Sequence, residues 1–144
     1  MYLTRKADYA IRCVLILSSQ KNKIANVTEV AEQMDIPKNS LAKIVQQLVK
    51  AGILASIRGI NGGFKLAKET HEINLLDVIE TVEGPLGMNR CVIDKRRCNF
   101  SNLCPVHPIW IELRALVVER LKSVDFSMLA SGDEAFNKVY KNLK

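Results

Sequence analysis

At 144 residues, the chain is long enough to bury the core of one ordinary domain without disulfide bonds. It has no run of about eighteen apolar residues, the length that a membrane-spanning helix needs, and its charged N-terminus is unlike a signal peptide. We therefore expect a cytoplasmic protein with no membrane partner and with reduced thiols. The net charge of +6 is uneven, because residues 1–72 carry eleven Lys or Arg against six Asp or Glu, whereas residues 73–144 carry ten against nine. The basic first half favours an acidic partner.

The first predicted helix spans about residues 4–20 and has a threonine at its N-terminal cap. Apolar residues recur along it at helical spacing, and Cys13 lies among them as a small core residue. Asp8 shares one flank of this helix with Arg5 and Arg12. A solvated ion pair with either arginine is therefore the plainest interpretation of Asp8.

Two shorter helices joined by a tight turn come next and form a helix-turn-helix pattern. The first is expected from a cap at Thr28 through Met34, and the second from about Asn39 to Ala51. The outward face of the second helix is polar but carries no acid, whereas a solvated helix surface usually includes Glu or Asp. Such a face favours nucleic acid, because its side chains can bond phosphates and base edges. It consists of Asn39, Ser40, Lys43, Gln46, Gln47 and Lys50.

A β-hairpin is predicted directly after the helix-turn-helix. Two short apolar runs, residues 53–57 and 64–67, flank an Asn-Gly-Gly turn whose glycines allow positive φ. A hairpin in this position is a wing. Its polar side chains Arg58, Asn61 and Lys65 would reach the DNA backbone or an adjacent minor groove.

The second half predicts a helix over residues 75–82, capped by Asn74, and a long helix from Pro105 to about Val124. Apolar residues on the long helix follow the spacing of a paired-helix seam, which predicts a homodimer. Packing of this helix against the chain's own core is the alternative. The predicted seam consists of Ile109, Trp110, Leu113, Leu116, Val117 and Leu121.

Three of the four cysteines, Cys91, Cys98 and Cys104, lie between these two helices, and His107 follows them. The intervening gaps are six, five and two residues, and polar residues and a proline break any helical period. We therefore expect a loop. Thiolates and imidazole together suit zinc or an iron–sulfur cluster, so the loop is predicted to be a metal site.

Two other uses of this loop remain open. Structural zinc could be held by the three cysteines and the histidine, or the thiols could sense redox state without metal. In the second case, Arg96 and Arg97 would favour the reactive thiolate of Cys98. An enzyme is not expected, because the chain has no P-loop, dinucleotide fingerprint, nucleophile elbow or HExxH motif.

Four stretches together resemble a known family: LTRKADYAIR, VTEVAEQMDIPKNSLAKIVQQLVKAG, IRGINGGFKLAK and the cysteine loop that ends in CPVHPIW. Over about residues 1–130 the chain is similar to the iron–sulfur-sensing winged-helix regulators of the Rrf-two family, the IscR and NsrR types. The resemblance implies a homodimer that binds double-stranded operator DNA through the second helix of the helix-turn-helix and the wing. It also implies a [2Fe–2S] or [4Fe–4S] cluster that senses redox, nitric oxide or iron–sulfur status and sets DNA affinity.

By the same resemblance, Cys91, Cys98 and Cys104 hold the cluster. The fourth ligand is either Asp8, reaching across from the other subunit, or His107, with a narrow preference for Asp8. The expected fold is mainly α with a small β-hairpin wing. Its expected parts are a winged helix-turn-helix domain (1–83), a cluster-binding loop (84–104), a dimerisation helix and following turn (105–130) and a polar tail (131–144).

Overall fold

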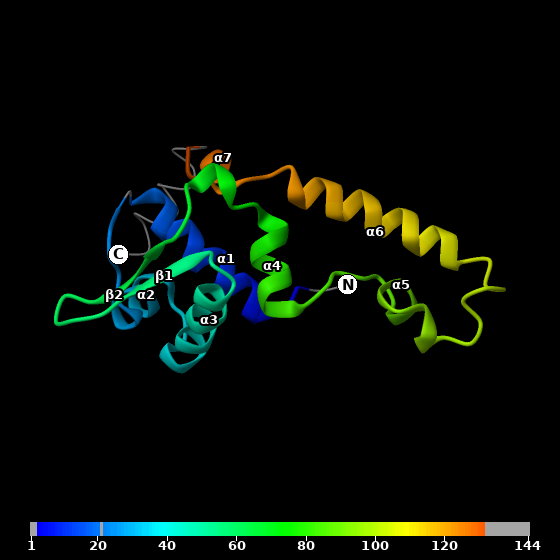
Figure 1. The fold of residues 1–144 in the computed structure, drawn as a ribbon, viewed down its shortest axis with the longest axis horizontal. Coiled ribbons are helices and arrows are strands. Elements are labelled where there is room, and N and C mark those ends of the chain that lie inside the picture. The colour runs from blue at the N-terminus through cyan, green and yellow to red at the C-terminus, as the bar shows by residue number, and fades with distance from the viewer. Residues whose placement is uncertain (1–2, 21, 132–144) are drawn as a thin grey trace.

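The computed structural model describes residues 3–20 and 22–131, and these form a mainly helical chain with a two-stranded antiparallel hairpin (Figure 1). This confirms the predicted fold class. We call α1 to α4, the hairpin and α7 the head, and we call α5, η2 and α6 the arm, which projects from it (Figure 1). None of the described helices is long and apolar enough to cross a membrane. The predicted tail lies outside the described residues, except for Ser131.

Helix α1 (Arg5–Ser19) is the centre of the head. The Thr4 hydroxyl accepts a hydrogen bond from the Ala7 N–H and caps the helix, as the sequence predicted. Ala7, Ala10 and Cys13 are fully buried, and their small side chains let α3, α4 and α7 pack closely around α1.

The helix-turn-helix consists of α2 (Val27–Met34) and α3 (Lys38–Lys50). The predicted cap at Thr28 is wrong, because α2 begins one residue before it and Asn26 accepts the Glu29 N–H at 2.8 Å. Asp35 ends α2 in the left-handed conformation, with φ of 52°, and the Ile36 N–H returns to a carbonyl of α2. This compact stop leaves room for only a short turn before α3.

The hairpin pairs β1 (Leu54–Ile57) with β2 (Gly63–Leu66), and Ile57 lies opposite Gly63 at the end of the ladder next to the turn. Strand β2 is fastened to the loop before α2, because Ala25 and Phe64 exchange two backbone hydrogen bonds of 2.9 and 2.8 Å. A Cβ atom at position 63 would lie 2.1 Å from the Ala25 carbonyl oxygen, so only glycine allows this approach. The hairpin therefore has a fixed position on the head.

Helix α4 (Leu75–Glu83) follows the 3₁₀ turn η1 (Thr70–Glu72), and Asn74 caps it as predicted by accepting the Asp77 N–H at 2.9 Å. The short helix α7 (Phe126–Ser131), which the sequence had not indicated, returns to the same region. Phe126 is fully buried, and its N–H bonds the Ile73 carbonyl at 2.9 Å. The chain after the arm thus completes the core of the head.

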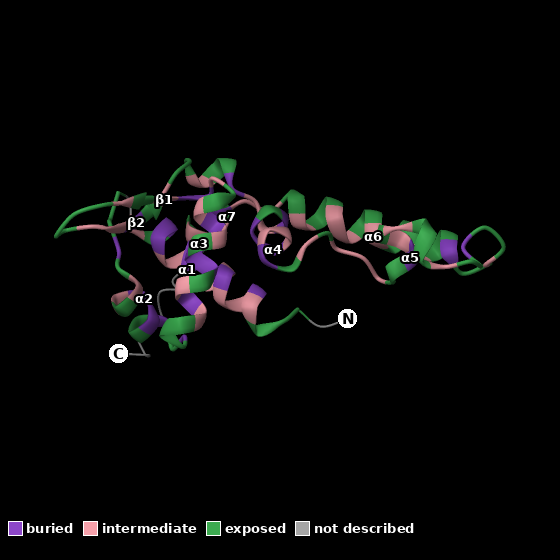
Figure 2. Ribbon diagram, turned by 60° about the horizontal axis from the view of Figure 1, so that its bottom comes forward, coloured by how far each residue is buried: buried purple, intermediate pink, exposed green. Residues whose placement is uncertain are grey.

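The arm contains α5 (Arg90–Ile93), the 3₁₀ turn η2 (Lys95–Arg97) and α6 (His107–Lys122). The predicted loop is therefore partly helical, and α6 begins at His107 rather than at Pro105. His107 is the only residue of α6 that is buried. Figure 2 shows the difference in burial between the two regions, with buried residues concentrated in the head and mostly exposed or half-buried residues along α6.

Candidate DNA-binding face and cysteine site

The outward face of α3 has the composition that the sequence predicted. Its apolar residues Leu41, Ile44 and Leu48 are buried against the head, which turns the polar side chains outward. Asn39, Lys43, Gln46 and Lys50 are exposed there, and Ser40 and Gln47 are half-buried at its edges. The Gln47 Oε1 atom is buried and has no hydrogen-bond partner among the described residues. This helix presents donors and acceptors along one side, as base and phosphate recognition requires.

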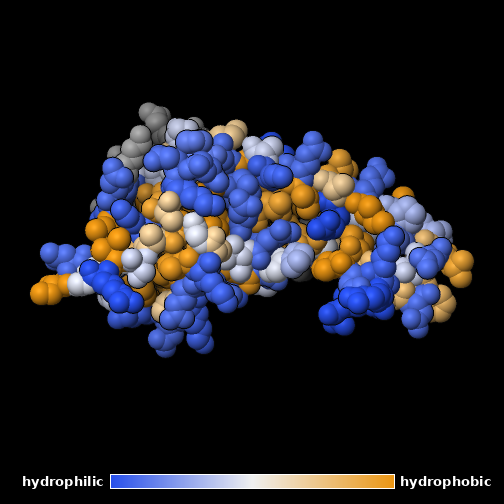
Figure 3. All heavy atoms as spheres, in the orientation of Figure 1, coloured by the Kyte–Doolittle hydropathy of each residue, from blue (hydrophilic) through white to orange (hydrophobic). Residues whose placement is uncertain are grey.

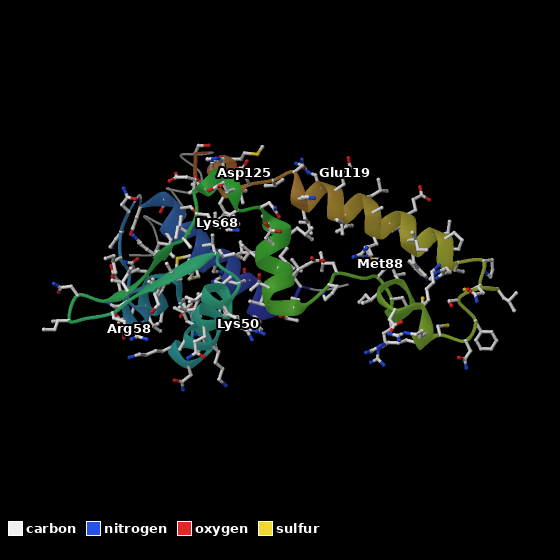
Figure 4. All side chains as sticks on the ribbon, in the orientation of Figure 1. Lys50, Arg58, Lys68, Met88, Glu119 and Asp125 are labelled. Atoms are coloured by element: carbon white, nitrogen blue, oxygen red, sulfur yellow. The ribbon has the colours of Figure 1, made fainter. Side chains whose placement is uncertain are left out.

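The hairpin extends this polar face. Its predicted contact residues Arg58, Asn61 and Lys65 are all exposed. Lys50 near the end of α3 and Arg58 on the hairpin both lie on the lower side of the head as viewed in Figure 4. Because α3 also contacts β1, the two elements place cations on the same side of the head.

The electrostatic character of this region is uniform over a long stretch. Residues 36–68, which include α3 and the hairpin, carry six Lys or Arg and no Asp or Glu. Within residues 3–20 and 22–131, none of those six cations forms an ion pair. A surface with cations and no compensating carboxylate attracts a polyanion.

Asp8 lies on α1, and its carboxylate is paired with an arginine of the same helix. Its carboxylate forms an ion pair of 2.7 Å with Arg12, four residues later, which was one of the partners considered from the sequence. Arg12 also donates to the Met34 carbonyl at 3.3 Å and so joins α1 to the end of α2. This second role of Arg12 was missed, since no local pattern indicates it.

The cysteine residues of the arm differ in exposure. Cys91, on α5, is buried, whereas Cys98 and Cys104 are half-buried, and all three are free thiols. His107 is 6% exposed, and neither of its ring nitrogens has a hydrogen-bond partner among the described residues. Its backbone N–H bonds the Cys104 carbonyl at 3.2 Å.

Three reduced thiols and an unpartnered imidazole are a donor set that suits an iron–sulfur cluster or zinc. Within the part of the chain that the structure describes, however, no three His, Cys, Asp or Glu residues are gathered closely enough to hold a metal ion. The three cysteines and His107 therefore share the arm and have the right chemistry, whereas Asp8 lies on α1 in the head. To enclose a metal ion, the four arm residues would have to move closer together.

The two arginines beside Cys98 face a carboxylate. Arg96 bonds Asp94 through its Nε at 3.0 Å, and the Arg97 Nε lies 3.9 Å from the same carboxylate. The hydrogen bond from Arg96 is the main reason that the pKa of Asp94 lies below its usual value. Asp94 thus neutralises part of the positive charge of Arg96 and Arg97 that was expected to favour the Cys98 thiolate. The ion pairs weaken only when the pH falls through the lowered pKa of Asp94 and its carboxylate is protonated.

Two further hydrogen bonds connect distant parts of the chain, one between the arm and the linker that follows α4 and one within the head. The Arg114 Nε on α6 donates to the Leu86 carbonyl at 2.6 Å, and Lys6 on α1 donates to the Val82 carbonyl at the end of α4 at 2.8 Å. Sequence reasoning did not identify either residue, since each pairs with a backbone carbonyl distant in the chain. The Arg114 bond therefore attaches α6 to the linker, and the Lys6 bond attaches α1 to the end of α4.

Comparison with known proteins identifies the family. Residues 3–132 match the family model Rrf2, described as "Iron-dependent Transcriptional regulator". The chain belongs to the Rrf2 family. NsrR of Shouchella clausii, a transcriptional regulator of helix-turn-helix type, is 40% identical over 124 residues, which cover 85% of this chain and 83% of that protein. IscR of Vibrio parahaemolyticus is 29% identical over 136 residues, which cover 93% of this chain and 80% of that one. As in these Rrf2 relatives, the chain is a DNA-binding transcriptional regulator, a class of proteins that are not enzymes.

Solved structures of Rrf2 proteins have the same fold. CymR (YrzC), the global cysteine regulator of B. subtilis, superposes with a TM-score of 0.75 at 26% identity, covering 92% of this chain and 99% of that one. IscR of T. potens has a TM-score of 0.75 at 23% identity, with 94% and 90% coverage, and supports the fold alone.

Proposed function

We propose that this Rrf2 protein is a homodimer whose binding to operator DNA depends on an iron–sulfur cluster held in the arm. The observation that carries the proposal is the buried imidazole of His107, whose two ring nitrogens find no partner within residues 3–20 and 22–131. It lies at the end of the arm that also carries three free thiols. A buried polar group without a partner costs free energy, so a native structure retains one where a ligand completes it.

In this proposal, Cys91, Cys98 and Cys104 are the thiolate ligands and His107 is the fourth. The Asp8 carboxylate is already bound to Arg12 at 2.7 Å and would have to leave that partner in order to ligate iron. We therefore place His107 before Asp8. When bound, the cluster supplies a centre that reacts with oxidants and with small diatomic molecules. The residues that hold it would then keep the arm in one preferred position.

DNA contact is assigned to the outward face of α3 and to the hairpin. The exposed side chains of α3 would read base edges in the major groove, and Arg58 and Lys65 would contact phosphates or the adjacent minor groove. The absence of any acid over residues 36–68 supports this assignment, because a carboxylate there would repel the phosphate backbone.

Coupling between the two sites runs through the linker. Ordering of the cysteine segment would fix the start of α6. Because Arg114 on α6 bonds the Leu86 carbonyl, a shift of α6 would move the linker and with it the end of α4, to which Lys6 attaches α1. A ligand shifts such an equilibrium only by its different affinity for the two arrangements. Operator affinity should therefore differ between the cluster-bound and cluster-free forms.

A metal-free thiol regulator is the second candidate. Cys98 and Cys104 are half-buried rather than enclosed, so both can meet a small oxidant. The similarity to CymR, described as a cysteine regulator, also supports this alternative. Structural zinc on the same donors is the third.

Anaerobic purification followed by visible absorbance and by iron, sulfide and zinc analysis separates the three candidates. We expect a coloured protein that contains iron and acid-labile sulfide, and we expect Cys98→Ser to lose both. A colourless protein with one zinc per chain, or with no metal, would refute the cluster and leave the DNA-binding assignment to be tested separately.

A further inference from the structure

The tip of the hairpin carries a large apolar side chain that nothing in the head covers. Ile60 has a relative exposure of 104%, above every other exposed apolar side chain of the described residues. Figure 3 shows an apolar point at the far end of the hairpin, surrounded by hydrophilic atoms. Single exposed apolar side chains are common on protein surfaces, so the support of Ile60 and the charges beside it decide what it can contact.

The turn that carries Ile60 is held in one shape. The Gly62 N–H bonds the Gly59 carbonyl at 3.0 Å and closes a four-residue turn with Ile60 and Asn61 in the middle. A Cβ atom at position 62 would lie 2.4 Å from the Ile57 carbonyl oxygen, so glycine is required there. Because Phe64, close to this turn on β2, is also bridged to Ala25, the isoleucine is presented on a fixed support.

The neighbours of Ile60 indicate the kind of partner. Arg58 and Lys65 are exposed on the same hairpin, and no acidic residue occurs between Asp35 and Glu69. An apolar tip with flanking cations fits a nucleic-acid groove, where cations meet phosphates and an apolar side chain enters between base pairs. A hydrophobic protein partner would not require the surrounding positive charge.

We propose that Ile60 is an apolar wedge that enters the minor groove of operator DNA and partly unstacks one base step. This adds sequence selectivity without a hydrogen bond to a base, because flexible pyrimidine–purine steps unstack most easily. The inference rests on the proposed placement of the hairpin against DNA and goes beyond it by assigning a specificity-determining residue.

The test uses full-length Ile60→Ala and Ile60→Leu with a duplex that the parent protein has selected from random-sequence DNA. A fluorescent base analogue at the step facing the hairpin reports unstacking. We expect Ile60→Ala to weaken binding about tenfold, as the loss of buried apolar area implies, and to abolish the fluorescence change. Ile60→Leu should retain both. The salt dependence should stay at the parent value, because no phosphate contact is removed.

Arg58→Ala and Ile93→Ala are the matched controls. Ile93 is 50% exposed but lies on the arm, so its truncation should leave binding unchanged. If Arg58→Ala weakens binding while Ile60→Ala keeps both affinity and fluorescence change, the wedge is refuted and the hairpin assignment stands. If neither variant differs from the parent, the hairpin does not contact DNA and both proposals fail.

Discussion

Burial distinguishes Cys13 in the core of the head from Cys98 and Cys104 in the arm. Cys13 is 0% exposed, and desolvation raises the pKa of its thiol to about 12, so it stays protonated and unreactive in the core. The apolar period around Cys13 was sufficient to predict this role. The free thiols of Cys98 and Cys104 are half-buried, and their use as ligands remains a prediction, because cysteine spacing reports donor chemistry and not the three-dimensional closure of a site.

The fourth ligand can be decided by two alanine variants. We expect His107→Ala to shift the visible spectrum of the cluster and to shorten its lifetime in air, because this buried imidazole lies only three positions after Cys104 in the sequence. Asp8→Ala should change neither property. A bleached Asp8→Ala protein beside an unaltered His107→Ala protein would assign the ligand to the aspartate.

Individual DNA contacts have a characteristic salt signature. We expect Lys43→Ala and Arg58→Ala to weaken operator binding with an unchanged thermal unfolding curve, because both side chains are exposed. Loss of a phosphate contact should lower the slope of log affinity against log salt by about one, whereas loss of a base contact should relax selectivity at one position. Lys122→Ala, which removes an exposed lysine at the end of the arm, is the control and should bind as the parent does.

At the scale of elements, the helices with a clear apolar period were predicted from the sequence. The predictions were wrong for helix ends whose position depends on contacts with residues far along the chain. Thr28 and Asn26 are both suitable caps, and the pairing of Ala25 with Phe64 sets the chain direction that favours Asn26. Helix α5 and turn η2 span only four and three residues, too few for a period to be visible. The burial of Phe126 by α1 and Ile73 likewise depends on contacts far along the chain.

The two candidate caps of α2 can be compared directly. Asn26→Ala should lower the free energy of unfolding by about 1 kcal/mol, because the Glu29 N–H loses its acceptor. Thr28→Ala is a matched control on the same exposed surface and should change stability by less than about 0.5 kcal/mol. Denaturant unfolding of both proteins measures the difference. A larger loss from Thr28→Ala would restore the cap that the sequence predicted.

For the whole molecule, the main question is the arm, because its helix α6 exposes several large apolar side chains. Ile109 and Leu116 on α6 are 50% and 56% exposed, and Leu113 is 38% exposed. Trp110, Val117 and Leu121 are half-buried. We therefore expect a partner to cover this apolar surface, and a second copy of the chain would match two-fold-related half-sites in operator DNA.

If the chain dimerises through the predicted seam, a single charge placed on the seam should disrupt the dimer, whereas the same charge beside the seam should not. We expect Leu116→Glu to yield monomers in sedimentation velocity and to lose most operator affinity, since each half-site would then be bound alone. Ala115→Glu places the same charge one residue away, off the predicted seam, and should remain dimeric. If Leu116→Glu is as dimeric as the parent, α6 is not the seam.

The central claim is that the state of the arm controls the head, and the most direct measurement is the operator affinity of cluster-bound and cluster-free protein from one anaerobic preparation. DNA selected separately by each form serves as the probe, so that sites preferred by either are included. We expect the two forms to differ about 5-fold to 150-fold on at least one selected sequence, the usual range of coupling between sites. Equal affinities on every selected sequence would contradict control by the cluster and would reduce the cysteine site to a structural role.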